Sequence, residues 1–247
     1  MKILLLEETD STNTYVSVHA DSLEDMTLVA AHSQTAGRGQ RGNSWESEPG
    51  RNICATLFHR PSGVPARMQF AVSEATALGV VDMLAHYGIE ALVKWPNDVY
   101  VGDRKICGIL IENAVAGTDL LHCRIGIGVN VNQTVFRSDA PNPVSMAMLL
   151  DMETPLSDAL ARLGEALRLR LGKAASPQGR AALHEEFLSR LWRGDGKPYP
   201  FRRRADGLRF QGVIDTVAPD GFITVTDTDS GEAGTYAFKE VEFLLEK

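Results

Sequence analysis

The chain has 247 residues, of which 44% are hydrophobic and 23% are charged, as in ordinary soluble globular proteins. This length suffices for one large domain with a substantial core and a second, smaller one. The net charge of -7 argues against non-specific binding to nucleic acid and against adhesion to an anionic membrane.

The N-terminal part of the chain predicts three strands and a short helix. The apolar run 3–6 favours a strand, and Asp10 or Ser11 can cap a helix over 12–19. Residues 27–32 are β-branched and apolar, which predicts a strand that leads into a glycine-rich segment. Residues 52–58 predict the strand that leaves this segment.

The middle of the chain predicts one long helix, four strands and then two further helices. Residues 68–86 are apolar nearly all round a helix that ends near Gly88, which indicates a buried helix lying across a sheet. The strands are predicted over 91–95, 98–101, 105–112 and 120–131, with a hairpin turn at Gly102. Two further helices are predicted over 156–171, with a leucine stripe opposite arginines and Glu165, and over 181–192.

The character of the sequence changes at 193–200, where two glycines and two prolines in eight residues predict a linker or domain edge. After it, short strands over 208–217, 222–228, 235–238 and 241–245 alternate with turn signals, which favours a small barrel. The larger part mixes strands and helices without strict alternation. We therefore predict an α+β fold with a mixed β-sheet and packed helices over 1–196, and a second domain over 197–247.

The chain carries no signal for export or membrane insertion. Its first apolar run is too short for a signal peptide, and no apolar stretch approaches the roughly 20 residues of a membrane span. Three cysteines, Cys54, Cys107 and Cys123, lie apart without metal-ligand spacing, which favours small buried side chains in a reducing cytosol over catalytic or metal-binding roles. We expect a cytoplasmic protein.

The most informative segment is 34–45, which reads QTAGRGQRGNSW. Its three glycines make the backbone easy to bend and costly to order, and two arginines lie among them. Such a loop can close over an anion while Trp45 stacks on a planar ring. By itself, the segment is equally typical of a flexible surface turn.

Three further motifs follow in the chain, and they read KWPND over 94–98, DRKICGIL over 103–110 and GIGVNVN over 126–132. Lys105 opens an apolar strand, so its charge is held near a sheet edge, although a solvated hairpin lysine has the same pattern. The glycines of the third motif lack the third glycine and the helix of a dinucleotide fingerprint.

Together, in this order, the four motifs resemble those of the biotin–protein ligases, which activate biotin with ATP and attach it to a lysine of a carrier protein. The resemblance covers about the whole chain, and Lys105 follows Lys94 by eleven residues, as in the family. It implies a core shared with class II synthetases and a C-terminal Src-homology-like β-barrel. Biotin, ATP and Mg²⁺ would give biotinyl-5'-adenylate, and a biotin carboxyl carrier protein of acetyl-CoA carboxylase or a related carboxylase would accept the biotin.

The resemblance also assigns residues to roles in the site. The implied catalytic residues are Lys105, Arg38 and Asp98. The implied biotin-binding residues are Ser11, Thr12, Asn13, Gln34, Gly37, Arg38, Gly39, Gln40, Lys105 and Gly108. The implied adenylate-binding residues are Arg38, Arg41, Trp45, Lys94, Asn97, Lys105 and Asn130. No fixed metal site is implied, and Mg²⁺ would arrive with ATP near Asp98.

Several of these residues also have plain structural interpretations. Hydroxyl groups at 11 and 12 suit a ureido ring because they donate and accept hydrogen bonds, yet the same residues are typical of a helix N-cap. Trp45 can stack on adenine or belong to the core. Asn130 can pair with the adenine edge or end a strand.

Two departures from the family pattern bear on function. Many members have arginine where this chain has Gln40, so the grip on the adenylate phosphate is in question and Arg41 can take part of that role. Some relatives carry an N-terminal winged helix-turn-helix that represses transcription. The first predicted strand begins at Ile3, so we expect no such domain and no specific binding to DNA.

Two alternative functions remain open from the sequence. A lipoate– or octanoyl–protein ligase can use the same scaffold, although the glycine segment and the C-terminal barrel favour biotin. A non-catalytic biotin or nucleotide sensor is the second alternative, and the presence of Arg38, Lys105 and Asn130 argues against it. A monomer and a homodimer are both compatible with the sequence.

Overall fold

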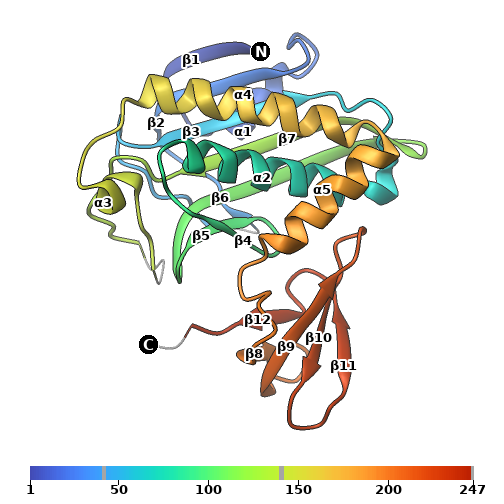
Figure 1. Cartoon of the computed structure of the whole chain (residues 1–247). Coiled ribbons are helices and arrows are strands. Elements are labelled where there is room, and N and C mark those ends of the chain that lie inside the picture. Colours follow the sequence, from blue (N-terminus) through green and yellow to red (C-terminus); the bar gives the residue numbers. More distant parts are fainter. Residues whose placement is uncertain (41–42, 139–141, 246–247) are drawn as a thin grey trace.

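The computed structural model describes residues 1–40, 43–138 and 142–245, which form two β-sheets with helices packed on the larger one (Figure 1). The larger sheet has seven strands in the order β1-β2-β3-β7-β6-β5-β4, and the smaller has five in the order β11-β10-β9-β8-β12. The elements of the larger part are β1 (Lys2–Thr9), α1 (Thr12–His19), β2 (Thr27–Gln34), β3 (Ile53–His59), η2 (Ala66–Met68), α2 (Phe70–His86), β4 (Leu92–Lys94), β5 (Asp98–Val101), β6 (Arg104–Ala116), β7 (Asp119–Val129), α3 (Met146–Leu150), α4 (Leu156–Ala174) and α5 (Pro177–Ser189). The smaller sheet contains β8 (Tyr199–Arg203), β9 (Arg209–Val217), β10 (Ile223–Asp227), β11 (Ala233–Tyr236) and β12 (Val241–Phe243).

The larger sheet is mixed. β1 and β2 run parallel, with α1 as the crossover between them, and the other neighbouring strands described in this sheet are antiparallel. β5 and β6 form the predicted hairpin at Gly102, whose φ of 57° is the left-handed conformation that glycine adopts without a steric penalty. The predicted α+β class with a mixed sheet is confirmed.

The two faces of the larger sheet bury different helices. Alternation along β2 shows this, because Leu28 lies in the core with α2, α4 and α5, whereas Val29 packs with Val16 of α1 on the other face. In Figure 1, α4 and α2 lie side by side across one face, and α5 packs against both. The face that carries α1 is left partly open, and it is there that the cleft described below is found.

Helix α2 is the buried helix that the apolar pattern predicts. With η2 it forms a 21-residue segment, Ala66–His86, that is long and apolar enough to cross a membrane by length and composition. The expectation that no stretch reaches this length is therefore wrong. In this fold, 72% of the most apolar 18-residue stretch of this segment is buried. At Gly79 the helix α4 packs so closely that a Cβ there would lie 3.1 Å from Leu167 Cδ2.

One buried arginine joins the three helices of this layer. Arg170 of α4 is 8% exposed, and its Nε and Nη2 donate to both carboxylate oxygens of Asp82 on α2 at 2.6 and 2.7 Å. It also donates to Glu186 of α5. The sequence placed this arginine on the solvent face opposite the leucines. It is buried instead because carboxylates from two neighbouring helices accept the hydrogen bonds that its guanidinium group donates.

A second buried polar pair joins α2 to α5. Glu74 is 2% exposed, and its Oε1 lies 2.6 Å from His184 Nδ1. Burial raises the pKa of Glu74 from its ordinary 4.5 to about 7, and the contact with His184 only partly opposes this. Between these two values the folded carboxyl keeps a proton that the unfolded chain has lost. The contribution of Glu74 to stability is thus present below pH 4.5 and is lost as pH rises towards 7.

We expect Glu74→Gln to remove this pH dependence. One pKa unit corresponds to about 1.4 kcal/mol. As the pH rises from 4.5 to about 7, the free energy of unfolding of the variant should therefore increase by on the order of 3 kcal/mol relative to that of wild type, with no further relative increase above pH 7. Urea unfolding at pH 5 and pH 8 measures the difference. Glu185→Gln changes an exposed neighbour and serves as the control. Parallel pH profiles for wild type and Glu74→Gln would contradict the assignment.

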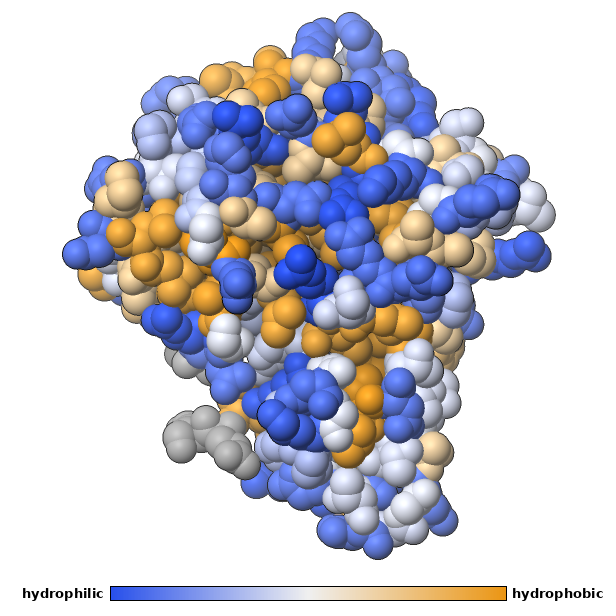
Figure 2. Space-filling model, in the orientation of Figure 1, coloured by the Kyte–Doolittle hydropathy of each residue, from blue (hydrophilic) through white to orange (hydrophobic). Residues whose placement is uncertain are grey.

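The smaller sheet is antiparallel and barrel-like, and it lies beyond α5 at the β4–β5 side of the larger sheet (Figure 1). Strand β8 was missed because Pro198 and Pro200 favour a linker; it nevertheless pairs with both β9 and β12. Trp95 anchors this sheet, since its Nε1 donates to Gly221 O at 2.9 Å and its ring meets Phe238 edge-on. Figure 2 shows apolar surface continuing across this junction. The division into domains 1–196 and 197–247 stays a prediction.

Candidate active site

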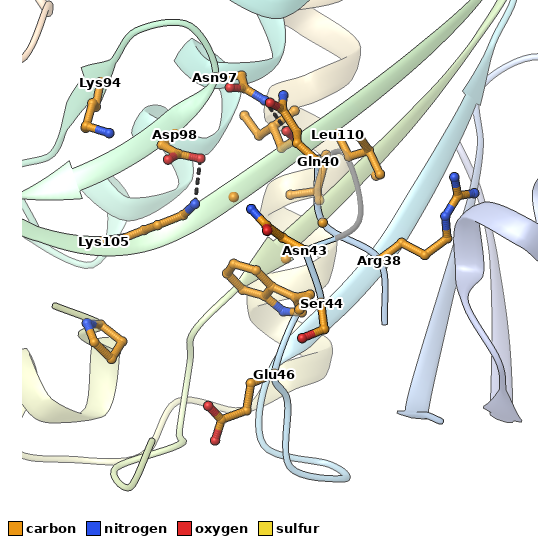
Figure 3. Close-up of a pocket in the computed structure, with 18 of the residues that line it drawn as sticks. Arg38, Gln40, Asn43, Ser44, Glu46, Lys94, Asn97, Asp98, Lys105 and Leu110 are labelled. Carbon is orange, nitrogen blue, oxygen red and sulfur yellow. Dashed lines mark hydrogen bonds and ion pairs between the residues drawn. The ribbon is translucent and has the colours of Figure 1, made fainter. Parts of the chain in front are cut away.

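A cleft of about 1070 Å³ runs along the sheet face opposite α2 and α4 and reaches the smaller sheet. It is lined by the start of α1, the glycine segment, strands β3 and β5 to β7, the 94–97 turn and residues of the smaller sheet. The sequence motifs, far apart in the chain, therefore meet in one cavity (Figure 3).

The floor of the cleft is a row of directly paired residues that crosses five strands. From β3 to β4 the row is Cys54, Gly128, Gly108, Asp98 and Lys94. Directly paired residues of antiparallel strands lie on the same face, and the isoleucines beside the two glycines belong to the helical core on the other face. The row is thus bare of side chains in its middle and charged at its β4 end.

The bare middle of the row holds the ring of Trp45. A Cβ on Gly128 would lie 2.3 Å from Trp45 Cε2, and a Cβ on Gly108 would lie 2.9 Å from Trp45 Cζ3. The indole therefore rests directly on the strand backbone, and Lys105 Nζ lies 5.9 Å from its ring centre. The close approach predicted at Gly108 is real, but the group that uses it here is Trp45. Stacking on adenine stays a prediction.

The glycine segment that delivers Trp45 is a narrow hairpin. Trp45 N donates to Gly37 O at 3.0 Å, and Gly39 N donates to Asn43 O at 2.7 Å. Gly37 needs to lack a side chain because a Cβ there would lie 2.6 Å from Trp45 O. The backbone of the described part of the segment is therefore paired, and this pairing directs the indole into the cleft.

The arginine of the segment does not join Lys105 in this structure. Arg38 donates to Glu112 Oε1 at 3.2 Å and extends away from Lys105 (Figure 3). Gln40 lines the cleft. Arg41, which the sequence predicted to share in binding phosphate, lies outside the described residues.

The polar end of the cleft is built by α1 and β2. Ser11 occupies the N-cap position of α1 but makes no capping hydrogen bond through its side chain. Gln34 of β2 takes that role, because its Oε1 accepts from Thr12 N at 2.8 Å. Thr12 Oγ1 in turn lies 2.8 Å from Thr56 Oγ1 of β3. The predicted side-chain cap is therefore wrong. Ser11, Thr12 and Gln34, which the resemblance assigns to biotin, all line the cleft, and their contact with biotin stays a prediction.

Asn13 carries the clearest sign of a ligand-binding position. It is 3% exposed, and its Oδ1 is buried without a hydrogen-bond partner among the described residues. Its amide also lies against Gly126, where an added Cβ would be 3.0 Å from Nδ2. An unpaired buried acceptor is costly, so this position is suited to a ligand that brings an N–H group.

The charged end of the cleft lies on β4, β5 and β6. Lys105 Nζ is 2.7 Å from Asp98 Oδ1 (Figure 3). Asn97, which is 7% exposed, donates from Nδ2 to Ile109 O and so fixes the turn before Asp98. Burial lowers the pKa of Lys94, and nearby Asp98 only partly opposes this. Two lysines thus lie at the same end of the cleft.

Asn130 has a structural task that the sequence did not reveal. Its Nδ2 donates to Val144 O at 3.0 Å and to Lys105 O at 3.4 Å. Both amide protons are therefore directed at backbone carbonyls that join the 142–146 segment to β6. Pairing with the adenine edge stays a prediction, and for Nδ2 it requires that these bonds be exchanged.

Sequence reasoning missed three polar residues near the cleft. Glu46 accepts from Arg137 N at 2.8 Å and from Ser138 N at 2.7 Å, which ties the glycine segment to the loop after β7. Thr56 and Glu112 interrupt otherwise apolar strands, and that interruption is the signal that can identify such residues. Residues of the smaller sheet, including Phe243, also line the cleft, and no comparable feature of the sequence indicates this.

The described residues include no group of three or more His, Cys, Asp or Glu side chains arranged to hold a metal ion. Asp98 is a single carboxylate that already faces Lys105. Mg²⁺ prefers oxygen ligands and is commonly held by one or two carboxylates together with substrate phosphates. This chemistry fits a metal ion delivered with a nucleotide, for which Asp98 can supply one oxygen.

Comparison with known proteins points to one family. Residues 5–130 match the model of the "Biotin/lipoate A/B protein ligase family". The bifunctional ligase/repressor BirA of Salmonella typhimurium is 31% identical over 233 residues, which is 90% of this chain and 71% of that protein. The biotin–[acetyl-CoA-carboxylase] ligase of Paracoccus denitrificans is 37% identical over 130 residues, 51% of this chain and 53% of that one. The aligned part spans about half the length or less of several other curated relatives.

The same fold occurs in a solved structure of the biotin protein ligase from Aquifex aeolicus in complex with biotin and ATP. That structure superposes with a TM-score of 0.80 over 99% of both chains, at 18% identity. The likeness extends over both sheets, so the fold of the smaller sheet is shared as well.

Proposed function

The chain belongs to the biotin/lipoate A/B protein ligase family, and on this premise we propose that it is an ATP-dependent biotin–protein ligase. Biotin and ATP react to give biotinyl-5'-adenylate and pyrophosphate. A lysine of a biotin carboxyl carrier protein, belonging to acetyl-CoA carboxylase or a related carboxylase, then takes the biotinyl group and AMP leaves. The observation that carries this proposal is a single cleft that places the unpaired Asn13 acceptor at one end and two lysines at the other.

The two ends of the cleft fit the two ends of biotin. The ureido group has N–H donors and a carbonyl acceptor, and the polar end offers Asn13 Oδ1 with hydroxyls from Ser11 and Thr12. The carboxylate at the other end meets the positive charge of Lys105. The bare glycine floor and Trp45 lie between them and provide an apolar wall for the ring and chain.

The same residues supply what adenylation needs. A biotin carboxylate oxygen attacks the α-phosphorus of ATP, and the bond to the pyrophosphate oxygen breaks. Lys105 offsets the repulsion between the two anions and stabilises the charge that develops during transfer. Bound Mg²⁺ would neutralise phosphate charge, with Asp98 as the protein ligand. The cleft excludes water from the mixed anhydride.

Transfer to the carrier needs no covalent intermediate with the enzyme. The neutral amine of the acceptor lysine attacks the acyl carbon of the adenylate, and the bond to the AMP oxygen breaks. Asp98 is the candidate for accepting the amine proton, since its carboxylate contacts Lys105 at the charged end of the cleft. Arg38 must leave Glu112 to reach the phosphate, so closure of the glycine segment would accompany adenylate formation.

Two features favour biotin over lipoate or octanoate. Lipoate and octanoate end in apolar atoms and bring no N–H group to Asn13. The second sheet also follows the catalytic part, as in the Aquifex aeolicus biotin protein ligase. A non-catalytic sensor would not need Lys105 and Asp98 in contact at the reacting end.

Three free, buried cysteines support the cytoplasmic setting.

An intact-mass assay tests this function. The chain is incubated with MgATP, a biotin carboxyl carrier domain, and either biotin, lipoate or octanoate. We expect a mass increase of one biotinyl group on the carrier, only with biotin and ATP. Modification with lipoate or octanoate instead would establish the alternative ligase, and no modification with any of the three acids would favour the sensor.

A further inference from the structure

The Lys94 ammonium is held in a way that differs from that of Lys105. Nζ of Lys94 lies 5.0 Å from the ring centre of Tyr100, 5.5 Å from that of Phe243 and 6.0 Å from that of Trp192. The structure gives this ammonium no ion pair and no hydrogen bond among the described residues. Three aromatic rings therefore form a cage around a largely buried cation.

The rings of this cage come from three separate parts of the chain. Tyr100 lies on β5, Trp192 follows α5, and Phe243 lies on β12 of the smaller sheet. The rings contact one another, with centre distances of 5.1 Å for Tyr100–Trp192 and 5.7 Å for Trp192–Phe243. Trp192 is fixed by a hydrogen bond from Nε1 to Gly102 O at 2.9 Å.

Phe243 is held in place by its own sheet. It pairs with Phe201 of β8 in the strand register, and the two rings lie 4.9 Å apart. Leu244 N donates to Pro200 O, and Arg193 Nη1 donates to Leu244 O at 2.9 Å. The position of this ring relative to Lys94 is therefore set by how the smaller sheet docks.

An aromatic cage and a carboxylate stabilise an ammonium in different ways. The faces of aromatic rings attract a cation through their quadrupole but carry no net charge. A carboxylate partner, as Asp98 is for Lys105, cancels most of the field that a ligand would feel. Among the described residues, Lys94 thus has no carboxylate in ion-pair contact to neutralise its charge, while its ammonium is held at one place in the lining of the cleft.

We propose that Phe243 completes this cage in order to hold the Lys94 ammonium, unneutralised, for the β- and γ-phosphates of ATP, which makes β12 a positioning element of the nucleotide site. The cross-strand pairing of Lys94 with Asp98 puts the ammonium one strand beyond the Lys105–Asp98 pair. Lys105 then serves the reacting carboxylate and α-phosphate, and Lys94 serves the leaving pyrophosphate. This assignment rests on the proposed function.

The test compares four variants in biotin-dependent ATP–pyrophosphate exchange. Phe243→Leu keeps an apolar side chain but removes the ring, and Phe243→Tyr restores it. We expect Phe243→Leu to raise KM for ATP about fivefold to tenfold, the worth of one desolvated cation–π contact, with KM for biotin nearly unchanged. Phe243→Tyr should return KM for ATP to near the wild-type value. Lys94→Met should raise it at least as much as Phe243→Leu.

Phe210→Leu is the matched control. Phe210 lies on β9 and stacks on Phe201, so the variant loosens the same sheet without touching the cage. An equal rise of both KM values in Phe243→Leu and Phe210→Leu would show a merely structural role and overturn the proposal. An unchanged KM for ATP in Lys94→Met would overturn it even if Phe243→Leu failed to fold.

Calorimetric titration with ATP separates this inference from the function on which it rests. If the wild-type chain catalyses no ATP–pyrophosphate exchange in the presence of biotin, the biotin ligase assignment is refuted. Weaker ATP binding by Phe243→Leu than by Phe210→Leu would still support the cage. Equal ATP affinity in wild type and Phe243→Leu refutes the cage, whatever the carboxylic acid substrate.

Discussion

Replacing Lys105 with alanine should lower the rate of biotin adenylation by about 100- to 1000-fold, the usual effect of removing one preorganised electrostatic contact to a transition state. The reason is that Lys105, whose Nζ lies 2.7 Å from Asp98, is the cation that we propose to meet the reacting carboxylate and the α-phosphate. Without it, the carboxylate of Asp98 faces the biotin carboxylate and the α-phosphate unopposed. Biotin-dependent ATP–pyrophosphate exchange measures the loss.

The fold should survive this change. Lys105 is 30% exposed through its side chain and fills no core volume, so the melting temperature should change little. Lys173→Ala, at an exposed lysine of α4, is the control for loss of one positive charge. Near wild-type exchange by folded Lys105→Ala would refute the catalytic role. Supplying preformed biotinyl-5'-adenylate then shows whether transfer to the carrier also needs this lysine.

Replacing Gly128 with alanine should reduce kcat/KM for biotin adenylation by about 10- to 100-fold through displacement of Trp45, since a misplacement of about 1 Å can cost that much. The added Cβ would lie 2.3 Å from Trp45 Cε2 and 2.6 Å from Nε1, so the ring cannot stay where it is. Alanine is otherwise well tolerated in a strand, and the residue pairs through its backbone only. The loss should therefore arise in the cleft and leave the sheet intact.

The matching control is Gly172→Ala in α4, where the new Cβ meets no atom within 4 Å. That variant should keep wild-type activity and gain slightly in stability, because alanine favours a helix over glycine by up to about 1 kcal/mol. Steady-state kinetics with thermal unfolding distinguish the two sites. Unaltered kcat/KM in Gly128→Ala would mean that Trp45 takes no part in binding either substrate.

Local sequence patterns determined most of the elements of the larger sheet. The helix over 12–19, the buried helix after Met68 and the β5–β6 hairpin follow from apolar periodicity and from glycine at turns, which depend on nearest neighbours in the chain. The order of the motifs was sufficient to identify the family. It did not show that Gly108 and Gly128 lie side by side, because cross-strand register depends on residues distant in sequence.

Only the tertiary structure decided how the site residues are held. Gln34 caps α1 from a neighbouring strand, Arg170 is buried because carboxylates of two other helices reach it, and Arg38 pairs with Glu112 across 74 residues of chain. Each of these contacts joins segments that no local pattern connects. The Lys94 cage is the strongest case, because its rings come from a strand, a linker and a second sheet, and the field around a charge is set by what surrounds it in space.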